Sequence, residues 1–239
     1  MKNTRVIPCL LMRGSGLVKT VKFRNAQYVG DAINTVKIFN EKEVDELIFL
    51  DILATKNNKE PNYKLINEIA RECFMPFSYG GGVRNFEQIK RILSSGAEKI
   101  SLNSAFFKDV NIISKAANHF GSQSIIVSID VKKNIMGNYS VCSDGGRKKQ
   151  KESPTDVARK AEAAGAGEIL LNSISNDGVM AGYDTKLIKE ISEAVSIPVI
   201  ACGGAGCLDD YRCAVKAGAS AVAAGSLMVY QGKNKSVLT

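Results

Sequence analysis

Three pairs of segments decide the fold. VDELIFLDI at residues 44–52 matches AGEILLNSI at 166–174, MPFSYGGGV at 75–83 matches IPVIACGGA at 197–205, and GAEKISLNS at 96–104 matches GASAVAAGS at 218–226. All three pairs are separated by the same 122 residues. Three matches at one offset indicate a chain built from two similar halves. Because each half would leave open strand edges by itself, the repeat predicts two half-barrels that close on one another.

Short apolar runs alternate with amphipathic stretches along the chain. The runs are VIPCLL, LIFLD, PFSYGG, KISLNS, IIVSID, EILLNS, PVIACGG and AVAAGS. Continuous aliphatic runs of about four to seven residues are typical of strands covered on both faces. The segments between them have helical spacing, as in Ala32, Val36 and Phe39. The sequence therefore predicts a single (β/α)8 barrel over residues 1–239, in preference to a doubly wound open sheet.

The eighth unit of this barrel is short. Only MVYQGKNKSVLT follows the last apolar run, too few residues for a full helix after a loop. Either this tail or a partner is expected to cover the gap.

Composition narrows the class of protein. The chain has 239 residues, of which 45% are hydrophobic and 23% charged, as in an ordinary soluble globular protein. The apolar run at residues 6–12 is too short for a signal peptide or a membrane span. Six cysteines without a CxxC pair and a single histidine, His119, offer few ligands for a metal. We expect reduced thiols in the cytoplasm, no metal, no cofactor and no membrane association.

The net charge of +8 allows nucleic acid, an anionic membrane or small phosphorylated ligands as partners. The densest basic run, DGGRKKQK at residues 144–151, has no interleaved aromatic residue, which weighs against nucleic acid. Such a run is usually a solvated loop. The functional alternative is that it lies over the barrel mouth, where Arg147 clamps a phosphate or nucleotide.

Glycines and small polar residues end several predicted strands. In such barrels the chemistry lies at the carboxyl ends of the strands, and glycine lets backbone N–H groups approach a phosphate. The ends of strands three and four predict one phosphate site, and those of strands seven and eight its symmetry equivalent. The residues concerned are Gly80–Gly82, Asn103 and Ser104 in the first cluster, and Gly203, Gly204, Gly225 and Ser226 in the second, with Asp177 and Gly178 after strand six.

Asp130 is the strongest acid–base candidate, because a carboxylate at the end of an apolar strand is desolvated and its pKa is raised. Its alternative role is to fix a loop. Asp51 ends the second run in the same way, and Lys19 lies beyond the first run as a cation. We expect all three to face one mouth.

Four charged residues are predicted at the opposite end of the barrel, where the strands begin: Arg5, Glu46, Lys99 and Glu168. Glu46 and Glu168 are repeat partners. From the residues alone, this is a salt-bridged plug that stabilises the barrel floor.

The sequence resembles the cyclase subunit family of imidazole glycerol phosphate synthase over nearly its whole length. The resemblance is carried by VIPCL, FLDI, GGGVR, KISLNSA, GSQSIIVSID, DGGRK, GAGEILLNS, NDG, GYD, IPVIACGGAG and the final GSL. It implies a histidine-biosynthesis-type barrel in which ammonia from a separate glutaminase subunit travels along the barrel axis to a bisphosphate at the mouth.

The resemblance also implies roles for individual residues. Phosphate contacts are implied for Gly82, Asn103, Ser104, Asp177, Gly178, Gly204, Gly225 and Ser226. The ring of Arg5, Glu46, Lys99 and Glu168 corresponds to an ammonia gate, with the glutaminase docked on the surface around it.

One position departs from the family pattern. The family uses two catalytic aspartates, at the ends of strands one and five, and here Asp130 is kept while the first position is Leu11. Leucine cannot transfer a proton, and loss of a positioned acid or base commonly costs about 100- to 10,000-fold in rate.

Leu11 and the short eighth unit resemble a paralogous branch associated with glycosyl amidation in surface-polysaccharide biosynthesis. In that branch a glutaminase and an asparagine-synthetase-like amidotransferase convert an acetamido group on a nucleotide-linked sugar into an acetamidino group. Our first hypothesis is therefore an ammonia-handling synthase subunit for sugar amidation. The alternatives are a true cyclase, with Asp130 acting alone or helped by Asp51, and a non-catalytic partner that activates the glutaminase.

Overall fold

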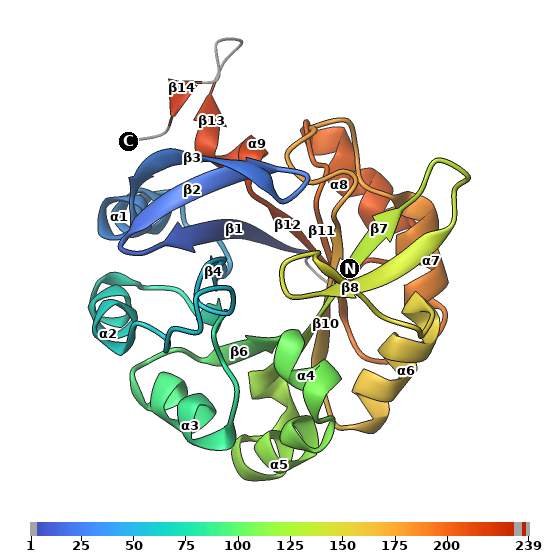
Figure 1. The fold of residues 1–239 in the computed structure, drawn as a ribbon. Helices are drawn as coiled ribbons and strands as arrows, with labels where there is room; N and C mark the ends of the chain where they lie inside the picture. The colour runs from blue at the N-terminus through green and yellow to red at the C-terminus, as the bar shows by residue number, and fades with distance from the viewer. Residues whose placement is uncertain (1–3, 232–235, 238–239) are drawn as a thin grey trace.

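Eight parallel strands form a closed barrel (Figure 1). The structure is a computed structural model that describes residues 4–231 and 236–237. Parallel pairings run from β1 through β4, β5, β6, β7, β10, β11 and β12, and β12 pairs again with β1. The strands are β1 (Arg5–Arg13), β4 (Leu47–Asp51), β5 (Phe77–Gly80), β6 (Lys99–Leu102), β7 (Ile125–Lys133), β10 (Glu168–Ser173), β11 (Val199–Cys202) and β12 (Ala221–Ala224). The predicted (β/α)8 barrel is confirmed.

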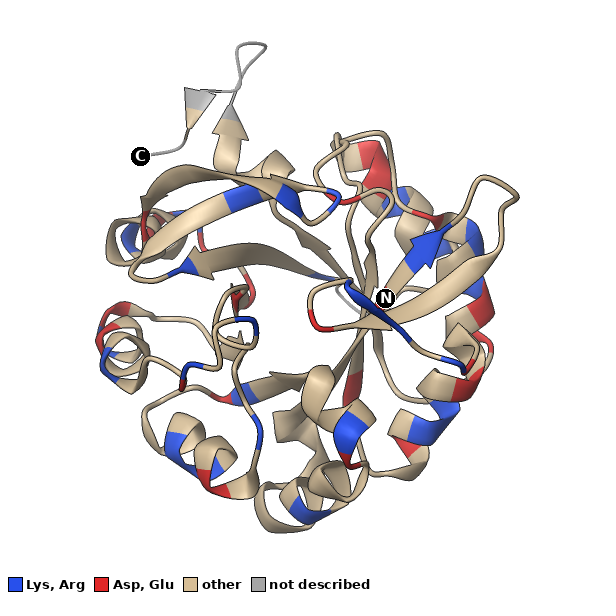
Figure 2. Ribbon diagram, viewed as in Figure 1, with Lys and Arg blue, Asp and Glu red and all other residues tan. Residues whose placement is uncertain are grey.

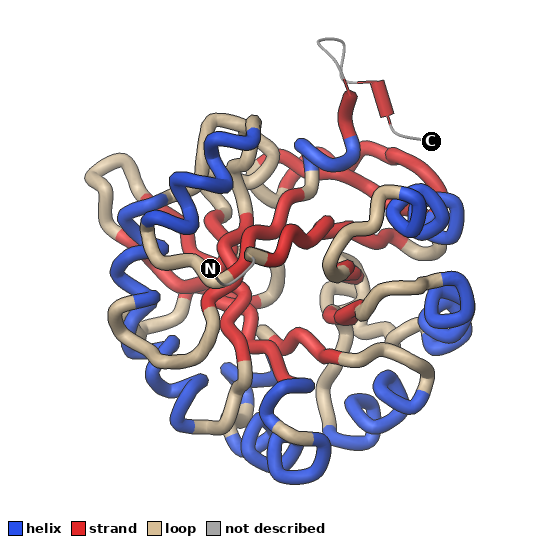
Figure 3. Tube along the Cα trace, turned by 180° about the vertical axis from the view of Figure 1, so that it is seen from behind, coloured by secondary structure: helices blue, strands red, loops and turns tan. Residues whose placement is uncertain are grey.

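Helices surround the strands, as the trace seen from behind shows (Figure 3). They are α1 (Ala32–Glu41), α2 (Tyr63–Glu72), α3 (Phe86–Ser94), α4 (Ser104–Lys108), α5 (Asn111–Phe120), the 3₁₀ turn η1 (Ser122–Ser124), α6 (Pro154–Ala163), α7 (Thr185–Ser192), α8 (Leu208–Lys216) and α9 (Ser226–Val229). The predicted inner face of α1, formed by Ala32, Val36 and Phe39, is buried. Across the described ranges, no helix combines the length and the apolar character needed to cross a membrane.

Two antiparallel hairpins extend from the carboxyl ends of β1 and β7. The first contains β2 (Gly16–Val21) and β3 (Arg24–Asp31), and the second contains β8 (Tyr139–Ser143) and β9 (Lys148–Lys149). They occupy equivalent places in the two halves, because Leu11 pairs with Val18 and Asp130 pairs with Cys142. The apolar runs did not predict these strands, since most of β3 is exposed and polar.

The part of the eighth unit that the structure describes contains one short helix. After β12 come the four-residue α9 and β13 (Tyr230–Gln231), which pairs with β14 (Ser236–Val237). The β13–β14 ribbon extends away from the barrel in Figure 1. Strand pairing between β1 and β12 therefore closes the barrel without a full eighth helix.

The chain has two apolar cores. The larger lies between the strands and the helices, and includes the fully buried Phe49, which contacts Phe77 edge to face with ring centroids 6.0 Å apart. The smaller fills the barrel interior with Ile7, Ile48 and Ile126 among other residues. Residues that alternate along each strand serve the two cores in turn, which explains the continuous apolar runs.

We expect Phe49→Ala to lower the free energy of unfolding by about 3–5 kcal/mol, because it removes a fully buried ring and leaves a cavity. Phe74→Ala is the matched control: Phe74 is 86% exposed, so its removal should change stability by less than about 0.5 kcal/mol. Urea unfolding followed by circular dichroism measures both. Equal losses in the two variants would contradict the assignment of Phe49 to the core.

Candidate functional site

A small cavity of about 30 Å³ lies at the carboxyl ends of β1, β10, β11 and β12. It is lined by Cys9, Leu11, Lys19, Phe23, Asn172, Asp177, Gly178, Cys202, Gly203, Gly204, Ala205, Ala224, Gly225 and Ser226. Leu11, Lys19 and the second predicted phosphate cluster are thus brought together at one mouth. This agreement follows from the parallel strands, which place all their carboxyl ends at one end of the barrel.

Asp130 is buried at the end of β7, with only 7% of its surface exposed. Burial raises the pKa of this carboxyl to about 7, opposed by a hydrogen bond from Ser128 and assisted by the negative charge of Asp177. The Ser128 hydroxyl donates to Oδ1 over 3.4 Å. A carboxyl with this pKa exchanges its proton near neutral pH, as general acid–base catalysis requires.

Leu11 occupies the position on β1 that the repeat relates to Asp130. It is 8% exposed and belongs to the inner apolar core, paired with Leu50 on one side and Val18 on the other. The mouth therefore carries a carboxyl at the end of the fifth barrel strand and an apolar wall at the end of the first.

Lys19 reaches the mouth from β2 and is 5% exposed. Its ammonium group lies against Gly225, where a side chain would overlap it. Gly225 therefore makes room for the cation, and Lys19 is held beside the predicted phosphate turn of β12.

Asp177 ties the β2–β3 hairpin across the mouth. Its Oδ2 accepts hydrogen bonds from the Thr20 hydroxyl (2.9 Å) and the Phe23 N–H (3.2 Å), and its backbone oxygen accepts from the Lys22 N–H (2.9 Å). Gly178 next to it touches the same hairpin, because a side chain there would overlap the Thr20 carbonyl. One carboxylate oxygen of Asp177 is thus occupied by the hairpin.

The structure does not bring Asp51 to the mouth. Asp51 pairs with Met12, on the face of β1 opposite to Leu11, and Met12 belongs to the outer core. Its Oδ1 accepts hydrogen bonds from the N–H groups of Leu53 and Ala54, each over 3.0 Å. Burial raises its pKa, while these bonds oppose the rise. The carboxylate fixes the turn after β4, the loop-fixing role that an aspartate at a strand end can also have.

The first predicted phosphate cluster lies beneath the second hairpin. The Asn103 amide donates to the Ser128 carbonyl over 3.0 Å, and the Ser104 hydroxyl accepts from the Asp144 N–H over 3.1 Å. The Gly82 N–H is used by Thr55 at 3.2 Å. No side chain caps the first amides of α4 or of its symmetry equivalent α9, so these N–H groups remain available to an anion.

Arg147 lies in the turn between β8 and β9, and its Nε donates to the Asp144 carbonyl over 2.8 Å. Figure 2 shows basic residues in β9 and at the end of β7, and β8 lies between these two strands. Arg147 is exposed and does not line the 30 Å³ cavity. The basic run is thus part of a hairpin that covers the first cluster rather than a free loop.

The four charged residues at the other end of the barrel form a closed ring. Arg5 bonds to Glu46 (2.7 Å) and Glu168 (2.6 Å), and Lys99 bonds to the same two carboxylates at 3.0 and 3.2 Å. The Ser78 hydroxyl donates to the other oxygen of Glu46. Burial alone would lower the pKa of Arg5, but the two carboxylates outweigh it and raise that pKa.

Sequence reasoning missed several residues of the mouth: Cys9, Phe23, Asn172 and Cys202. Asn172 is the most informative, because its Oδ1 is buried and has no hydrogen-bond partner within the described residues. It pairs with Asp130 in register on β10. In the sequence, Asn172 could have been recognised as a site residue because it is a polar residue at the end of the apolar run EILLNS. Among residues 4–231, 236 and 237, no group of three or more His, Cys, Asp or Glu side chains is placed to hold a metal.

The fold defines an enzyme of the (β/α)8 barrel class, with the buried carboxyl of Asp130 and glycine-rich turns at its mouth. Residues 5–235 match the family model described as histidine biosynthesis protein, and the chain belongs to this family. It is a lyase or synthase subunit of the imidazole glycerol phosphate synthase type.

Relatives support the same assignment. A Pseudomonas aeruginosa protein named "Putative imidazole glycerol phosphate synthase subunit hisF2" is 53% identical, covering 100% of this chain and 95% of its own length. A Leptospira interrogans protein with the name "Putative imidazole glycerol phosphate synthase subunit HisF" is 48% identical, covering 100% and 94%. An Endomicrobium trichonymphae protein named "Imidazole glycerol phosphate synthase subunit HisF" is 44% identical, covering 97% and 89%.

Glu46→Ala should lower the free energy of unfolding by about 3 kcal/mol, because it leaves Arg5 and Lys99 with one carboxylate between them. Glu68→Ala is the control, since Glu68 forms an exposed pair with Lys64 over 3.8 Å and should matter by less than about 0.5 kcal/mol. Urea unfolding measures the loss of stability in both variants. A loss at Glu46 no larger than that at Glu68 would show that the ring does not stabilise the floor.

Asp130→Asn should change stability in a pH-dependent way. The folded-state pKa of about 7 lies above the ordinary 3.8, so the stability that Asp130 contributes is fully present below about pH 4 and lost as the pH rises to about 7. Asparagine does not ionise. The free energy of unfolding of the variant should therefore rise relative to that of the wild type, by up to a few kcal/mol, between about pH 4 and pH 7. Urea titrations at several pH values measure the difference, with Asp209→Asn as the surface control. A difference that stays constant from pH 4 to 7 would contradict the raised pKa.

Proposed function

We propose that the chain is an ammonia-using cyclase-type subunit that works with a glutaminase. In the proposed reaction, ammonia and the phosphoribulosyl formimino precursor give imidazole glycerol phosphate and aminoimidazole carboxamide ribotide. One observation carries the proposal: Asp130, with a pKa of about 7, lies at the carboxyl end of the same barrel whose opposite end is closed by the charged ring. Membership in the histidine biosynthesis family supports this reaction class.

Asp130 is the proposed proton-transfer group, and Lys19 is a cation at the same mouth, against Gly225, that would stabilise negative charge on the substrate. Asn172 offers an unpaired oxygen between Asp130 and the second cluster. We propose that one phosphate binds at Gly82, Asn103 and Ser104 with help from Arg147, and the other at Asp177, Gly178, Gly204, Gly225 and Ser226.

The side chains that fill the barrel interior support the proposal that ammonia passes along the barrel axis from the ring to the mouth. The interior above the ring is filled mainly by aliphatic side chains such as Ile7 and Leu170, with buried Ser78, Ser101 and Ser128 among them. The Ser101 hydroxyl has no hydrogen-bond partner within the described residues. We propose that the glutaminase docks at the ring face, and that at least one ion pair of the ring opens when ammonia passes.

Substrate binding requires the first hairpin to move. A cavity of about 30 Å³ is far smaller than the roughly 300 Å³ or more of typical small-molecule sites. Release of the Thr20 and Phe23 bonds to Asp177 would free both the space and the Asp177 carboxylate. The hairpin is therefore a proposed lid that carries Lys19.

Leu11 favours a second candidate function. With one of the two family carboxylates replaced by an apolar wall, ring closure loses a proton-transfer group, while the charged ring is intact. This pattern is expected if ammonia is handed to an asparagine-synthetase-like amidotransferase, which would amidate a nucleotide-linked sugar. If the chain has lost its own reaction altogether, the remaining alternative is a non-catalytic subunit that activates the glutaminase.

The test is release of aminoimidazole carboxamide ribotide by the purified chain with saturating ammonium salt at mildly alkaline pH, which bypasses the glutaminase. We expect turnover by the wild type, a loss of about 100- to 10,000-fold in Asp130→Asn, and a gain in Leu11→Asp. Leu50→Asp is the matched control, because it adds a carboxylate to the strand position that pairs with Leu11.

The outcomes separate the candidates. A silent wild type whose Leu11→Asp variant turns over would reject the cyclase and favour the amidation candidate. A wild type that turns over equally well as Asp130→Asn would show that Asp130 is not the acid–base group. If the folded chain and Leu11→Asp are both silent yet the chain stimulates a glutaminase, the non-catalytic alternative holds.

A further inference from the structure

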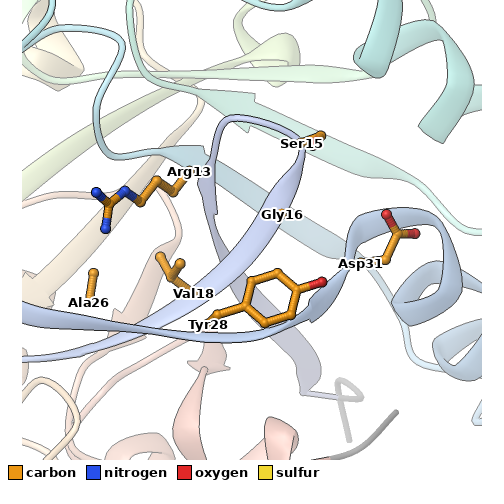
Figure 4. Close-up of a pocket in the computed structure, with 7 residues that line it drawn as sticks. All are labelled: Arg13, Ser15, Gly16, Val18, Ala26, Tyr28 and Asp31. Atoms are coloured by element: carbon orange, nitrogen blue, oxygen red, sulfur yellow. The ribbon is translucent and has the colours of Figure 1, made fainter.

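A second recess lies beside the mouth and is used by none of the steps above. Its volume is about 450 Å³, within the range of small-molecule sites. Figure 4 shows the seven residues that line it: Arg13, Ser15, Gly16, Val18, Ala26, Tyr28 and Asp31. All come from the end of β1, the β2–β3 hairpin and the residue that caps α1.

The recess is built from two rows of cross-strand neighbours on one face of the β1–β2–β3 sheet. Leu11 pairs with Val18, and Val18 pairs with Tyr28. Directly paired residues point to the same side of a sheet, so this row leads from the mouth, which Leu11 lines, to Tyr28. The recess is therefore continuous with the face of the sheet that meets the reaction site.

Gly16 creates the hollow in the second row. It stands between Arg13 and Asp31, pairing with both, and has no side chain to fill the space between them. The Tyr28 ring leans over this gap, since a methyl group on Gly16 would lie 2.7 Å from Cε2 of the ring. Tyr28 nevertheless stays 70% exposed, so much of its aromatic surface is open to a ligand.

The polar groups of the recess are placed at its two ends (Figure 4). Arg13 is exposed, and within the described residues its side chain forms no ion pair or hydrogen bond. At the other end, Asp31 Oδ1 caps α1 by accepting from the N–H groups of Ile33 (2.9 Å) and Asn34 (3.1 Å). Its Oδ2 has no such partner among the residues that the structure describes and can accept from a ligand.

We infer that this recess binds a nucleoside 5′-monophosphate moiety, with the base on the Tyr28 ring, the phosphate on Arg13 and the ribose between them. Each contact uses ordinary chemistry: bases stack on aromatic rings, and a guanidinium matches phosphate geometry. Asp31, at the Tyr28 end, is placed to accept from an N–H group of the base. A simple anion would use the Arg13 guanidinium but not the exposed Tyr28 ring. A nucleotide would use both, because it carries a phosphate and a base.

The inference rests on the proposed function only in taking the mouth as the reaction site. A nucleotide held by Arg13 and Tyr28 would lie on the same sheet face as Leu11, so it would place a group linked to it towards Asp130. Binding itself does not depend on turnover, and it can be measured at equilibrium on the purified chain.

The experiment is calorimetric titration of the purified chain with adenosine and uridine 5′-monophosphates, with ribose 5-phosphate and adenosine as partial probes. We expect both nucleotides to bind, Arg13→Met to weaken binding at least 10-fold, and Tyr28→Ala to weaken it about 5- to 100-fold. Tyr28→Phe keeps the ring and should bind within about twofold of the wild type. Arg159→Met removes the same charge from an exposed position on α6 and is the matched control.

Three results would overturn the inference. These are absence of nucleotide binding by the folded wild type, binding that Arg13→Met and Tyr28→Ala leave unchanged, and binding of ribose 5-phosphate as tight as that of the nucleotides. The second would place the nucleotide at the glycine turns, and the third would reduce the recess to a phosphate site. A chain that binds nucleotide through Arg13 and Tyr28 but releases no aminoimidazole carboxamide ribotide would uphold the recess while rejecting the cyclase.

Discussion

The hydrogen bonding that closes eight parallel strands is the constraint on which the rest of the molecule depends. Because all strands run in the same direction, closure gathers their beginnings into the ring of Arg5, Glu46, Lys99 and Glu168, and their ends into the mouth around Asp130. Two sites separated by the whole strand length thus share one axis. The interior between them is apolar, so it desolvates charged groups at both ends, and each end must satisfy them differently. At the floor two cations and two anions neutralise one another, whereas at the mouth burial keeps the Asp130 carboxyl protonated up to about pH 7.

The approximate twofold symmetry explains where the two halves diverge. Each half extends its first strand into a hairpin, and a short helix without a side-chain cap follows its last strand, so both predicted phosphate clusters have the same construction. The symmetry fails at the position proposed for proton transfer, where the first half has Leu11 and the second has Asp130. It also fails in the hairpins: the first is tied to Asp177 and carries Lys19, while the second covers Asn103 and Ser104. The two halves therefore share one fold but place different side chains at the mouth: an acidic one at Asp130 and an apolar one at Leu11.

The fold and most of the mouth were predictable from the sequence, since strand order and strand ends follow from the apolar runs and their repeat. Gly225 and Asp130 lie at these ends, and their positions required only the topology, whereas Lys19 lies on the hairpin strand β2 that the runs did not predict. Asp51 shows the limit of that logic: it ends a strand too, but alternation turns it to the outer face, where two backbone amides hold it. Asn172 and the recess at Tyr28 were missed for a different reason. Their meaning lies in an unpaired oxygen and in the space above Gly16, and neither is a property of residue type or spacing.

The first hairpin joins these features into one mechanical unit. Its β2 strand supplies Lys19 to the mouth and the Thr20 bond to Asp177, its turn supplies the Phe23 bond to Asp177, and its β3 strand supplies Tyr28 to the recess. A ligand that occupies the recess therefore contacts the element that must move for the mouth to open. A ligand shifts an equilibrium between two states only if it binds them with different affinity. A ligand in the recess can therefore influence the mouth only if the shape of the recess changes when the hairpin's bonds to Asp177 break. The pairing of Gly16 with both Arg13 and Asp31 makes such a change local to β1, β2 and β3, because separation of β2 from β1 would draw Arg13 away from Tyr28.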